Sequence, residues 1–148
     1  SMQLIDSLED IGALRESQEI ECKLARGKDG KGALPNDVWE TYSAFANTDG
    51  GDIFLGLKEK ADGSFVFEGI ENTQKVLSEF WNGINNTQKV SCNLLSERHV
   101  HVISLDGKSL IQIHVPKAGR KQRPVFINNN PITGTFKRAN SADMSLSR

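Results

Sequence analysis

The sequence predicts an α+β fold: a single domain with a mixed sheet of about six to eight strands and two or three helices. Short runs in which every second residue is apolar recur along the chain, as in half-buried strands. Longer stretches carry apolar residues three and four apart, as in amphipathic helices. Two Asp-Gly pairs, at 62–63 and 106–107, separate strand-like runs and predict hairpins. A length of 148 residues fits one domain.

Three helices are predicted. The first covers residues 3–10 and should end at Gly12, because glycine commonly follows a helix. The second begins at Pro35, which suits a first helical turn, and ends at Asn47. The third covers residues 73–85. The apolar faces that predict these helices are Leu4, Ile5, Leu8 and Ile11; Val38, Trp39, Tyr42, Phe45 and Ala46; and Val76, Leu77, Phe80, Trp81 and Ile84.

The remaining apolar runs predict strands joined by polar loops. Residues 25–33 are rich in glycine and lysine and predict a mobile loop, and residues 116–123 predict a basic loop. The expected strands cover residues 18–24, 52–57, 64–67, 90–95, 99–105, 109–115, 125–127 and 133–138.

Composition indicates a soluble, cytoplasmic protein. The chain is 37% hydrophobic and 25% charged, and it has neither a membrane-length apolar run nor a signal segment. Cys22 and Cys92 form no C-x-x-C pair, so we expect reduced thiols. Ser1-Met2 resembles a tag remnant before a native start. We therefore expect the N-terminal part of a longer protein, with a further domain after Arg148.

The histidines give a weak metal signal. His99 and His101 are two residues apart in a predicted strand and should face the same side. A solvated strand face is favoured over a metal-binding pair.

Charge is unevenly distributed, although the net charge is only −1. Residues 1–106 contain ten Lys or Arg against eighteen Asp or Glu, whereas residues 107–148 contain eight Lys or Arg against Asp143 alone. Such asymmetry indicates either a face that binds a polyanion or a basic strand edge kept soluble by its charges.

The segment Asn47-Thr48-Asp49-Gly50-Gly51 predicts a tight turn between a helix and a buried strand. Glycine allows positive φ and close backbone approach. The segment is not a P-loop, because the Lys-[Ser/Thr] pair is missing, and a helix precedes it, unlike the Rossmann fingerprint. We therefore expect a structural turn, with Asn47 capping the helix or in a left-handed conformation.

Seven segments occur in an order that carries a family resemblance: ESQEIECK (16–23), SAFANTDGG (43–51), IFLGL (53–57), GI (69–70), IQIHVP (111–116), RPVFI (123–127) and GTFKR (134–138). From about Glu16 to Ser141 the chain resembles the Schlafen-type AlbA-like domain, also described as a divergent AlbA DNA-binding domain. The resemblance implies the N-terminal nucleic-acid-binding module of a bacterial transcriptional-regulator-like protein. DNA and RNA remain alternatives.

The resemblance also implies an alternative, a metal-dependent endoribonuclease-like domain. In animal Schlafen proteins two such lobes form an RNA-cleaving core with three acids. Those acids correspond here to Glu16, Glu21 and Glu59, with Lys23 beside them, although the family usually has aspartate where Glu59 stands. Carboxylates would bind Mg²⁺ or Mn²⁺, and Lys23 would steady a phosphate.

A single lobe lacks the partner lobe, so we expect the isolated domain not to be an enzyme. A homodimer would restore the pairing and is the favoured assembly. The third alternative is a protein-interaction module without a nucleic-acid role. Within the acidic-site reading, the turn at residues 47–51 would support the strand that presents Glu59 toward Glu21.

Basic residues predict phosphate contacts without base reading, because no aromatic ladder accompanies them. We therefore expect weak, largely sequence-independent binding; a solvated basic turn is the alternative. The candidate residues are Lys117, Arg120, Lys121 and Arg123 in one loop, Lys137 and Arg138 near the C-terminus, and Lys28 and Lys31 in the Gly-Lys loop.

Overall fold

A computed structural model of the chain describes residues 4–139 and 142–145. Within these residues the predicted α+β class is confirmed, with three α-helices, one short 3₁₀ helix and eight strands. Ser1, Met2, Ser141 and Arg148, on which some of the expectations depend, lie outside the described residues. The elements are α1 (Leu8–Arg15), β1 (Ile20–Lys23), α2 (Val38–Asn47), β2 (Gly51–Leu55), β3 (Leu57–Glu59), β4 (Phe65–Phe67), α3 (Thr73–Ile84), η1 (Glu97–His99), β5 (Val100–Leu105), β6 (Lys108–Val115), β7 (Phe136–Ala139) and β8 (Ala142–Ser145).

The strands are divided among three sheets. The central sheet has four strands in the order β1-β2-β6-β5, and it is mixed because β1 runs parallel to β2 while the other neighbours are antiparallel. Two smaller sheets are the antiparallel pairs β3-β4 and β7-β8. Both predicted Asp-Gly turns join paired strands, β3 to β4 and β5 to β6.

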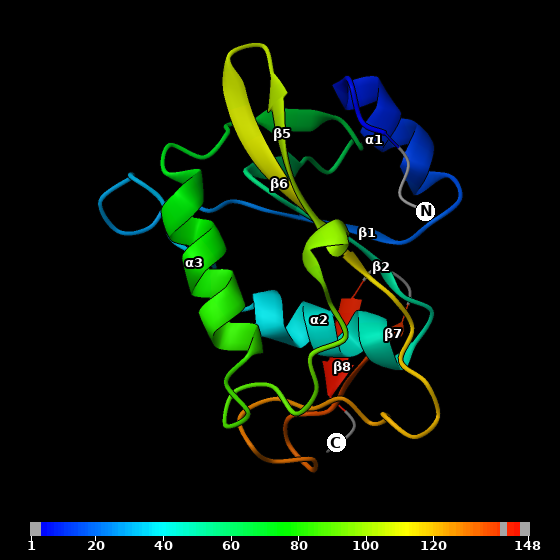
Figure 1. Cartoon of the computed structure of the whole chain (residues 1–148). Coiled ribbons are helices and arrows are strands. Elements are labelled where there is room, and N and C mark those ends of the chain that lie inside the picture. Colours follow the sequence, from blue (N-terminus) through cyan, green and yellow to red (C-terminus); the bar gives the residue numbers. More distant parts are fainter. Residues whose placement is uncertain (1–3, 140–141, 146–148) are drawn as a thin grey trace.

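Helices cover both faces of the central sheet (Figure 1). Alternation along each strand sends neighbouring side chains to opposite faces. Ile53, Leu55 and Ile113 therefore join a core with α2 and α3, whereas Phe54 and Leu110 join a second core with α1. The two-sided cover explains why all five residues of β2 are buried.

The helix α2 is the most deeply buried helix of the described chain, and nine of its ten residues are buried. Its Trp39 ring stacks on Phe80 of α3, with ring centroids 5.4 Å apart and planes 12° apart. The two helices approach closely at Gly83, where a Cβ atom would lie 2.2 Å from the Trp39 ring. This packing fixes α2 against both α3 and the sheet.

The first helix begins later than predicted. The side chain of Ser7 accepts a hydrogen bond from the amide of Asp10 and caps the helix there, so Gly12 lies inside α1 rather than at its end. Leu4 precedes the helix and its side chain is exposed instead of buried. The apolar spacing was correct for Leu8 and Ile11, but the cap determined where the helix starts.

The prediction of a strand over residues 90–95 was wrong. The strand predicted over residues 125–127 forms only isolated β-bridges. Val90 bridges Ile127, and Phe126 bridges Thr135. The side-chain oxygen of Asn93 accepts a hydrogen bond from the amide of Leu95. This bond forms a local turn, so the backbone here does not pair as a strand. The last predicted strand, 133–138, is shifted to Phe136–Ala139.

The turn after α2 uses its two glycines in different ways. Gly50 has a φ of 75°, and its amide donates to the carbonyl of Phe45 at the end of the helix. Gly51 starts β2 at a place where a Cβ atom would lie 2.8 Å from the ring of Phe45. The chain therefore reverses directly over a buried aromatic ring.

No described helix is long and apolar enough to cross a membrane. Cys22 and Cys92 are free thiols, and both are half-buried.

Replacing Gly51 with alanine should lower the free energy of unfolding by about 1–3 kcal/mol, because the new methyl group overlaps a Phe45 ring that has no room to move. Gly12→Ala is the matched control. Its Cβ would lie 3.9 Å from Phe65 in a helix interior, so that variant should gain up to about 1 kcal/mol. Urea denaturation followed by circular dichroism measures both. Equal stability of the two variants would contradict the close approach at Gly51.

Candidate functional site

The last turn of α2 holds two later segments of the chain through the side chain of Asn47. Its amide nitrogen donates to the carbonyls of Val125 (2.8 Å) and Phe136 (2.9 Å), and its oxygen accepts the amide of Val125 (2.8 Å). Ser43, one turn earlier, donates to the carbonyl of Val125 (2.7 Å) and accepts the amide of Phe136 (3.0 Å). The prediction that Asn47 caps the helix or adopts a left-handed conformation was wrong: Thr48 is the cap, and Asn47 is not among the residues with positive φ.

The basic loop 116–124 is fixed at both ends to the same helix. The amide of Ala118 donates to the carbonyl of Ala46 (2.8 Å), while Val125 just after the loop is held by Asn47. Between these anchors the loop makes a turn, in which the amide of Gly119 donates a hydrogen bond to the side-chain oxygen of Gln122 (3.0 Å). The loop is an anchored turn at the lower end of the molecule in Figure 1.

A basic pocket opens where this loop meets the start of β7. Its volume is about 380 Å³, and it is lined by Asn47, Arg120, Arg123, Pro124, Thr135 and Lys137. The lining contains three cationic side chains and no carboxylate. Asn47 and Thr135 are buried and form the floor, and Thr135 donates to the carbonyl of Pro131 (2.6 Å).

The three cations of the pocket make no ion pair with a described residue, and each is exposed. They come from two separate segments, Arg120 and Arg123 from the loop and Lys137 from β7. Like charges gathered without a counter-charge raise the free energy of the folded chain. The pocket is therefore suited to an anion.

The other predicted basic residues are placed differently. Lys121 is exposed beside the pocket lining, and Lys117 lies 4.0 Å from the carboxylate of Asp49. Lys28 and Lys31 are exposed in the loop to the left of α3 in Figure 1, away from the pocket at the lower end. That loop is tied to α3 by Lys75, which donates to the carbonyl of Gly32 (2.6 Å).

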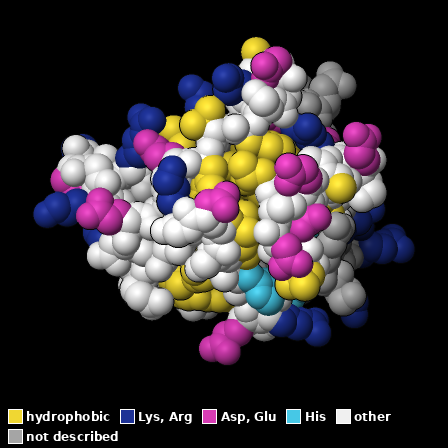
Figure 2. All heavy atoms as spheres, turned by 90° about the horizontal axis from the view of Figure 1, so that it is seen from above, with side chains coloured by type: hydrophobic (Ala, Val, Ile, Leu, Met, Phe, Trp, Pro, Cys, Tyr) yellow, Lys and Arg dark blue, Asp and Glu magenta, His cyan; other side chains and the backbone are white. Residues whose placement is uncertain are grey.

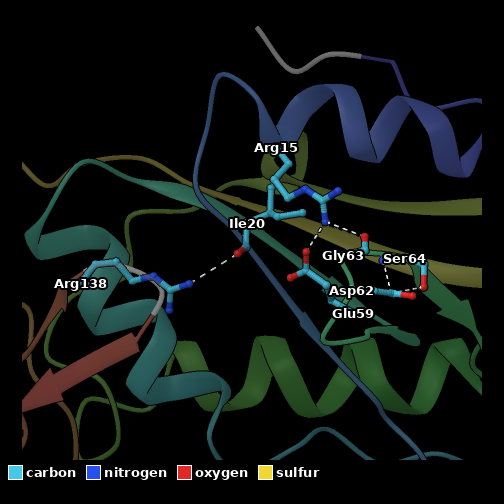
Figure 3. Close-up of polar contacts among 7 residues, drawn as sticks. All are labelled: Arg15, Ile20, Glu59, Asp62, Gly63, Ser64 and Arg138. Carbon is cyan, nitrogen blue, oxygen red and sulfur yellow. Dashed lines mark hydrogen bonds and ion pairs between the residues drawn. The ribbon is translucent and has the colours of Figure 1, made fainter.

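The prediction that Arg138 contacts nucleic acid was wrong, because its side chain is not on the surface. Only 4% of its side chain is exposed, and its guanidinium pairs with Glu21 (2.9 Å) and lies 5.0 Å above the ring centroid of Phe45. It also donates to the carbonyl of Ile20 (3.5 Å), as Figure 3 shows. Successive residues of a strand point to opposite sides, so Lys137 faces the pocket while Arg138 faces the interior.

Two of the three predicted acids are paired with arginines, which come from different elements of the fold. Glu59 at the end of β3 pairs with Arg15 of α1, which also donates to the carbonyl of Gly63 (3.0 Å; Figure 3). Glu21 pairs with Arg138, and Glu16 is exposed at the end of α1 without an ion pair to a described residue. Lys23 pairs with Asp37 (3.2 Å).

The charges of two of these acids nevertheless act on one thiol. Burial, together with the negative charges of Glu59 and Glu21, raises the pKa of Cys22 to about 12. Among the described residues, no group of three or more His, Cys, Asp or Glu side chains is arranged to hold a metal ion. As arranged, Glu16, Glu21 and Glu59 do not fit Mg²⁺ or Mn²⁺, because arginines pair with the carboxylates of Glu21 and Glu59 and the three acids do not form one group.

The histidines form a cluster that the sequence did not indicate. Nδ1 of His114 lies 3.0 Å from a carboxylate oxygen of Asp52, which is 1% exposed and also accepts from Gln18. The ring of His99, in η1 rather than in a strand, stacks on His114 with centroids 6.1 Å apart. Burial and the charge of Arg98 lower the pKa of His99.

His101 turns away from this cluster. Its ring nitrogen lies 2.8 Å from the carbonyl of Arg98, and the side chain is exposed. The predicted pairing of His99 and His101 on one strand face was therefore wrong.

Another face of the molecule combines charged side chains of both signs with exposed apolar residues. Figure 2, viewed from above Figure 1, shows Asp and Glu side chains beside an exposed apolar stripe, with histidine at its lower edge. The basic pocket lies at the opposite, lower end of Figure 1.

The family model described as Schlafen, AlbA_2 matches residues 16–147, which is most of the chain. The chain belongs to this family. No curated protein matches it at a significant level.

Two solved structures resemble this Schlafen AlbA_2 domain. One is the N-terminal domain of the "Putative ATP-dependent DNA Helicase RecG-related Protein" from Nitrosomonas europaea, with 26% sequence identity and a TM-score of 0.63 over 93% of this chain and 88% of that one. The other is the DIP2311 protein from Corynebacterium diphtheriae, with 17% identity and a TM-score of 0.59 over 88% of this chain and 22% of that one. The second likeness concerns the fold alone.

Sequence reasoning found the cations of the pocket but missed its floor. The roles of Asn47 and Thr135 depend on partners that are far away in sequence, since Asn47 binds backbone groups 78 and 89 residues later. The only local signal was the spacing of Ser43 and Asn47, which are four residues apart and share a helix face.

Changing Asn47 to aspartate should lower the free energy of unfolding by at least about 2 kcal/mol, because two buried carbonyls lose their donor. The pocket should also lose its shape, since both segments that carry cations are released. Asn36→Asp, an exposed residue on the loop before α2, is the control for the added charge. Thermal denaturation measures both variants; a melting temperature of N47D equal to that of N36D would contradict the anchoring role of Asn47.

Proposed function

We propose that the domain binds nucleic acid through its sugar-phosphate backbone, with the basic pocket as the main contact, and that it serves as a DNA-binding module of a transcriptional-regulator-like protein. The observation that carries the proposal is the gathering of Arg120, Arg123 and Lys137 in one pocket without a carboxylate. Phosphate oxygens are the anions that such donors bind in nucleic acids.

The anchoring of the pocket supports binding over a solvated turn. A loop that only keeps the protein soluble needs no fixed geometry, whereas this one is held by Ala46 and Asn47 at its two ends. Donors whose positions are fixed before binding lose less conformational entropy when the ligand arrives. Lys121, which is exposed in the same loop, adds a further cation, whereas Lys117 lies near the carboxylate of Asp49.

One structural relative supports a nucleic-acid-related role. The structure with 26% identity is the N-terminal domain of a protein named as helicase-related, and helicases act on nucleic acid. The pocket offers charge but no aromatic platform, so binding should depend on salt and little on base sequence.

Fluorescence anisotropy with labelled duplex and single-stranded DNA tests the proposal. Affinity should fall steeply between about 50 and 200 mM salt. Arg123→Gln should weaken binding about tenfold at the lower salt concentration, because one charge-assisted hydrogen bond is lost, and should reduce the salt slope by about 1. Arg120→Gln and Lys137→Gln should act in the same direction.

Arg98→Gln is the matched control, because Arg98 is an exposed arginine of η1 outside the pocket. It should leave the affinity within about twofold. Equal losses for R98Q and R123Q would mean that only overall charge matters, and absence of binding by the parent at low salt would refute the proposal.

Two further expectations belong to the same proposal. Lys28 and Lys31 would add a second, weaker contact if a nucleic-acid strand extends along the molecule. A Lys28→Ala, Lys31→Ala double variant tests this contact separately from the pocket.

A homodimer would place two pockets on one ligand. Light scattering after size exclusion measures the oligomeric state. A clean dimer that binds no nucleic acid would favour a protein-interaction role.

A metal-dependent nuclease is the second candidate function, and one observation bears on it: the negative charges of Glu21 and Glu59 both act on the thiol of Cys22. As the carboxylates are paired with Arg138 and Arg15, the site would first have to open.

Incubation of labelled structured RNA with Mn²⁺ or with EDTA separates the two functions. We expect retention in both and cleavage in neither, because the arginines compete with a cation for the acids. Manganese-dependent cleavage that Glu21→Gln abolishes would support the nuclease instead. Glu19→Gln is the matched control, since Glu19 lies 4.0 Å from Arg138 and is outside the predicted triad.

A further inference from the structure

We infer that the basic pocket takes the terminal phosphate monoester of a nucleic-acid strand in preference to an internal phosphodiester; this rests on the proposed function. The first reason is the number of cations at one place. Arg120, Arg123 and Lys137 line a single pocket of about 380 Å³, whereas a groove that follows a backbone spreads its cations along several nucleotides.

Charge matching is the second reason. An internal phosphodiester carries one negative charge, while a terminal monoester carries about 1.5 to 2 at neutral pH and presents three acceptor oxygens. Two guanidinium groups and one ammonium group, with no carboxylate in the lining, match the monoester better. Arginine can also bind two oxygens of one phosphate at once.

The shape of the pocket is the third reason. Its floor is closed by Asn47 and Thr135, which are 8% and 2% exposed and whose polar atoms are bonded to the protein's own backbone. A terminal phosphate can reach this floor end-on from the open side of the pocket. Because the floor is already bonded, the ligand is held by the three cations through its charge.

The positions of these cations are set before any ligand binds. Arg123 lies two residues before Val125, and Lys137 lies one residue after Phe136, the two residues that Asn47 holds. A cluster of three like charges with fixed backbones and no counter-ion among the described residues stores repulsion that a dianion relieves.

A structural role for the same charges makes a different prediction. The pocket lies at the C-terminal end of α2, where cations stabilise the helix dipole slightly. In that case Arg123→Gln would lower the melting temperature and leave any preference for phosphorylated strands unchanged.

The experiment uses the full chain and one single-stranded DNA of roughly 12 nucleotides, which spans a typical single-strand site. The strand is prepared with a 5′-phosphate, with a 3′-phosphate, or with hydroxyl groups at both ends. Each is titrated in competition with a labelled strand at about 150 mM salt, which screens weak contacts. Inorganic phosphate is a fourth competitor.

We expect one phosphorylated strand to bind at least about tenfold more tightly than the hydroxyl strand. Arg123→Gln should remove this preference without lowering the melting temperature, and Arg98→Gln should keep it. The preference should also shrink as the pH falls from about 7.5 to 5.5, because the monoester takes up its second proton near pH 6.

The outcomes separate the two proposals. Equal binding of all three strands that still depends on Arg123 would overturn the terminal-phosphate inference and leave nucleic-acid binding intact. Inorganic phosphate that competes as well as the phosphorylated strand would also overturn it, since the strand would then contribute nothing. Absence of binding in every arm would overturn both.

Discussion

The carboxamide of Asn47 is the constraint on which the described architecture depends most. It is 8% exposed, and it joins one helix to the backbone of two segments 78 and 89 residues away. Because amide groups donate and accept at once, a single side chain satisfies the amide and carbonyl of Val125 and the carbonyl of Phe136. Buried backbone groups of irregular segments need such partners, and the segment around residue 125 has only isolated bridges to provide them.

The alternation of side chains along β7 then determines which of its basic residues faces the pocket. With Phe136 fixed, Lys137 faces the pocket and Arg138 faces the interior, where it pairs with Glu21 of β1. The same four-residue strand thus supplies a cation for the surface and an ion pair that links the C-terminal segment to the central sheet. Two adjacent basic residues in the sequence have opposite roles for a purely geometric reason.

The sequence allowed prediction of those features that local patterns determine. Helices α2 and α3 end within one residue of the predicted positions, and both Asp-Gly turns join paired strands, because periodicity and turn chemistry are local. The prediction failed where a side chain forms a hydrogen bond with the nearby backbone and so changes the local structure, as at Ser7 and Asn93. The candidate site followed the same division: its cations were visible as a basic run, whereas its floor depends on contacts between distant segments.

The difference between paired and unpaired charges also bears on the choice between binding and cleavage. Metal-dependent cleavage would need the acids near β1 to exchange arginine for a divalent cation. The pair between Arg138 and Glu21 resists this exchange, since Arg138 is almost fully buried, lies on the ring of Phe45 and bonds the carbonyl of Ile20. Removing its partner would leave a buried charge uncompensated, which is far more costly than opening a surface ion pair. No such cost applies at the basic pocket, where the cations already face solvent and an anion reduces their repulsion, so the physics of the two sites favours binding at the pocket.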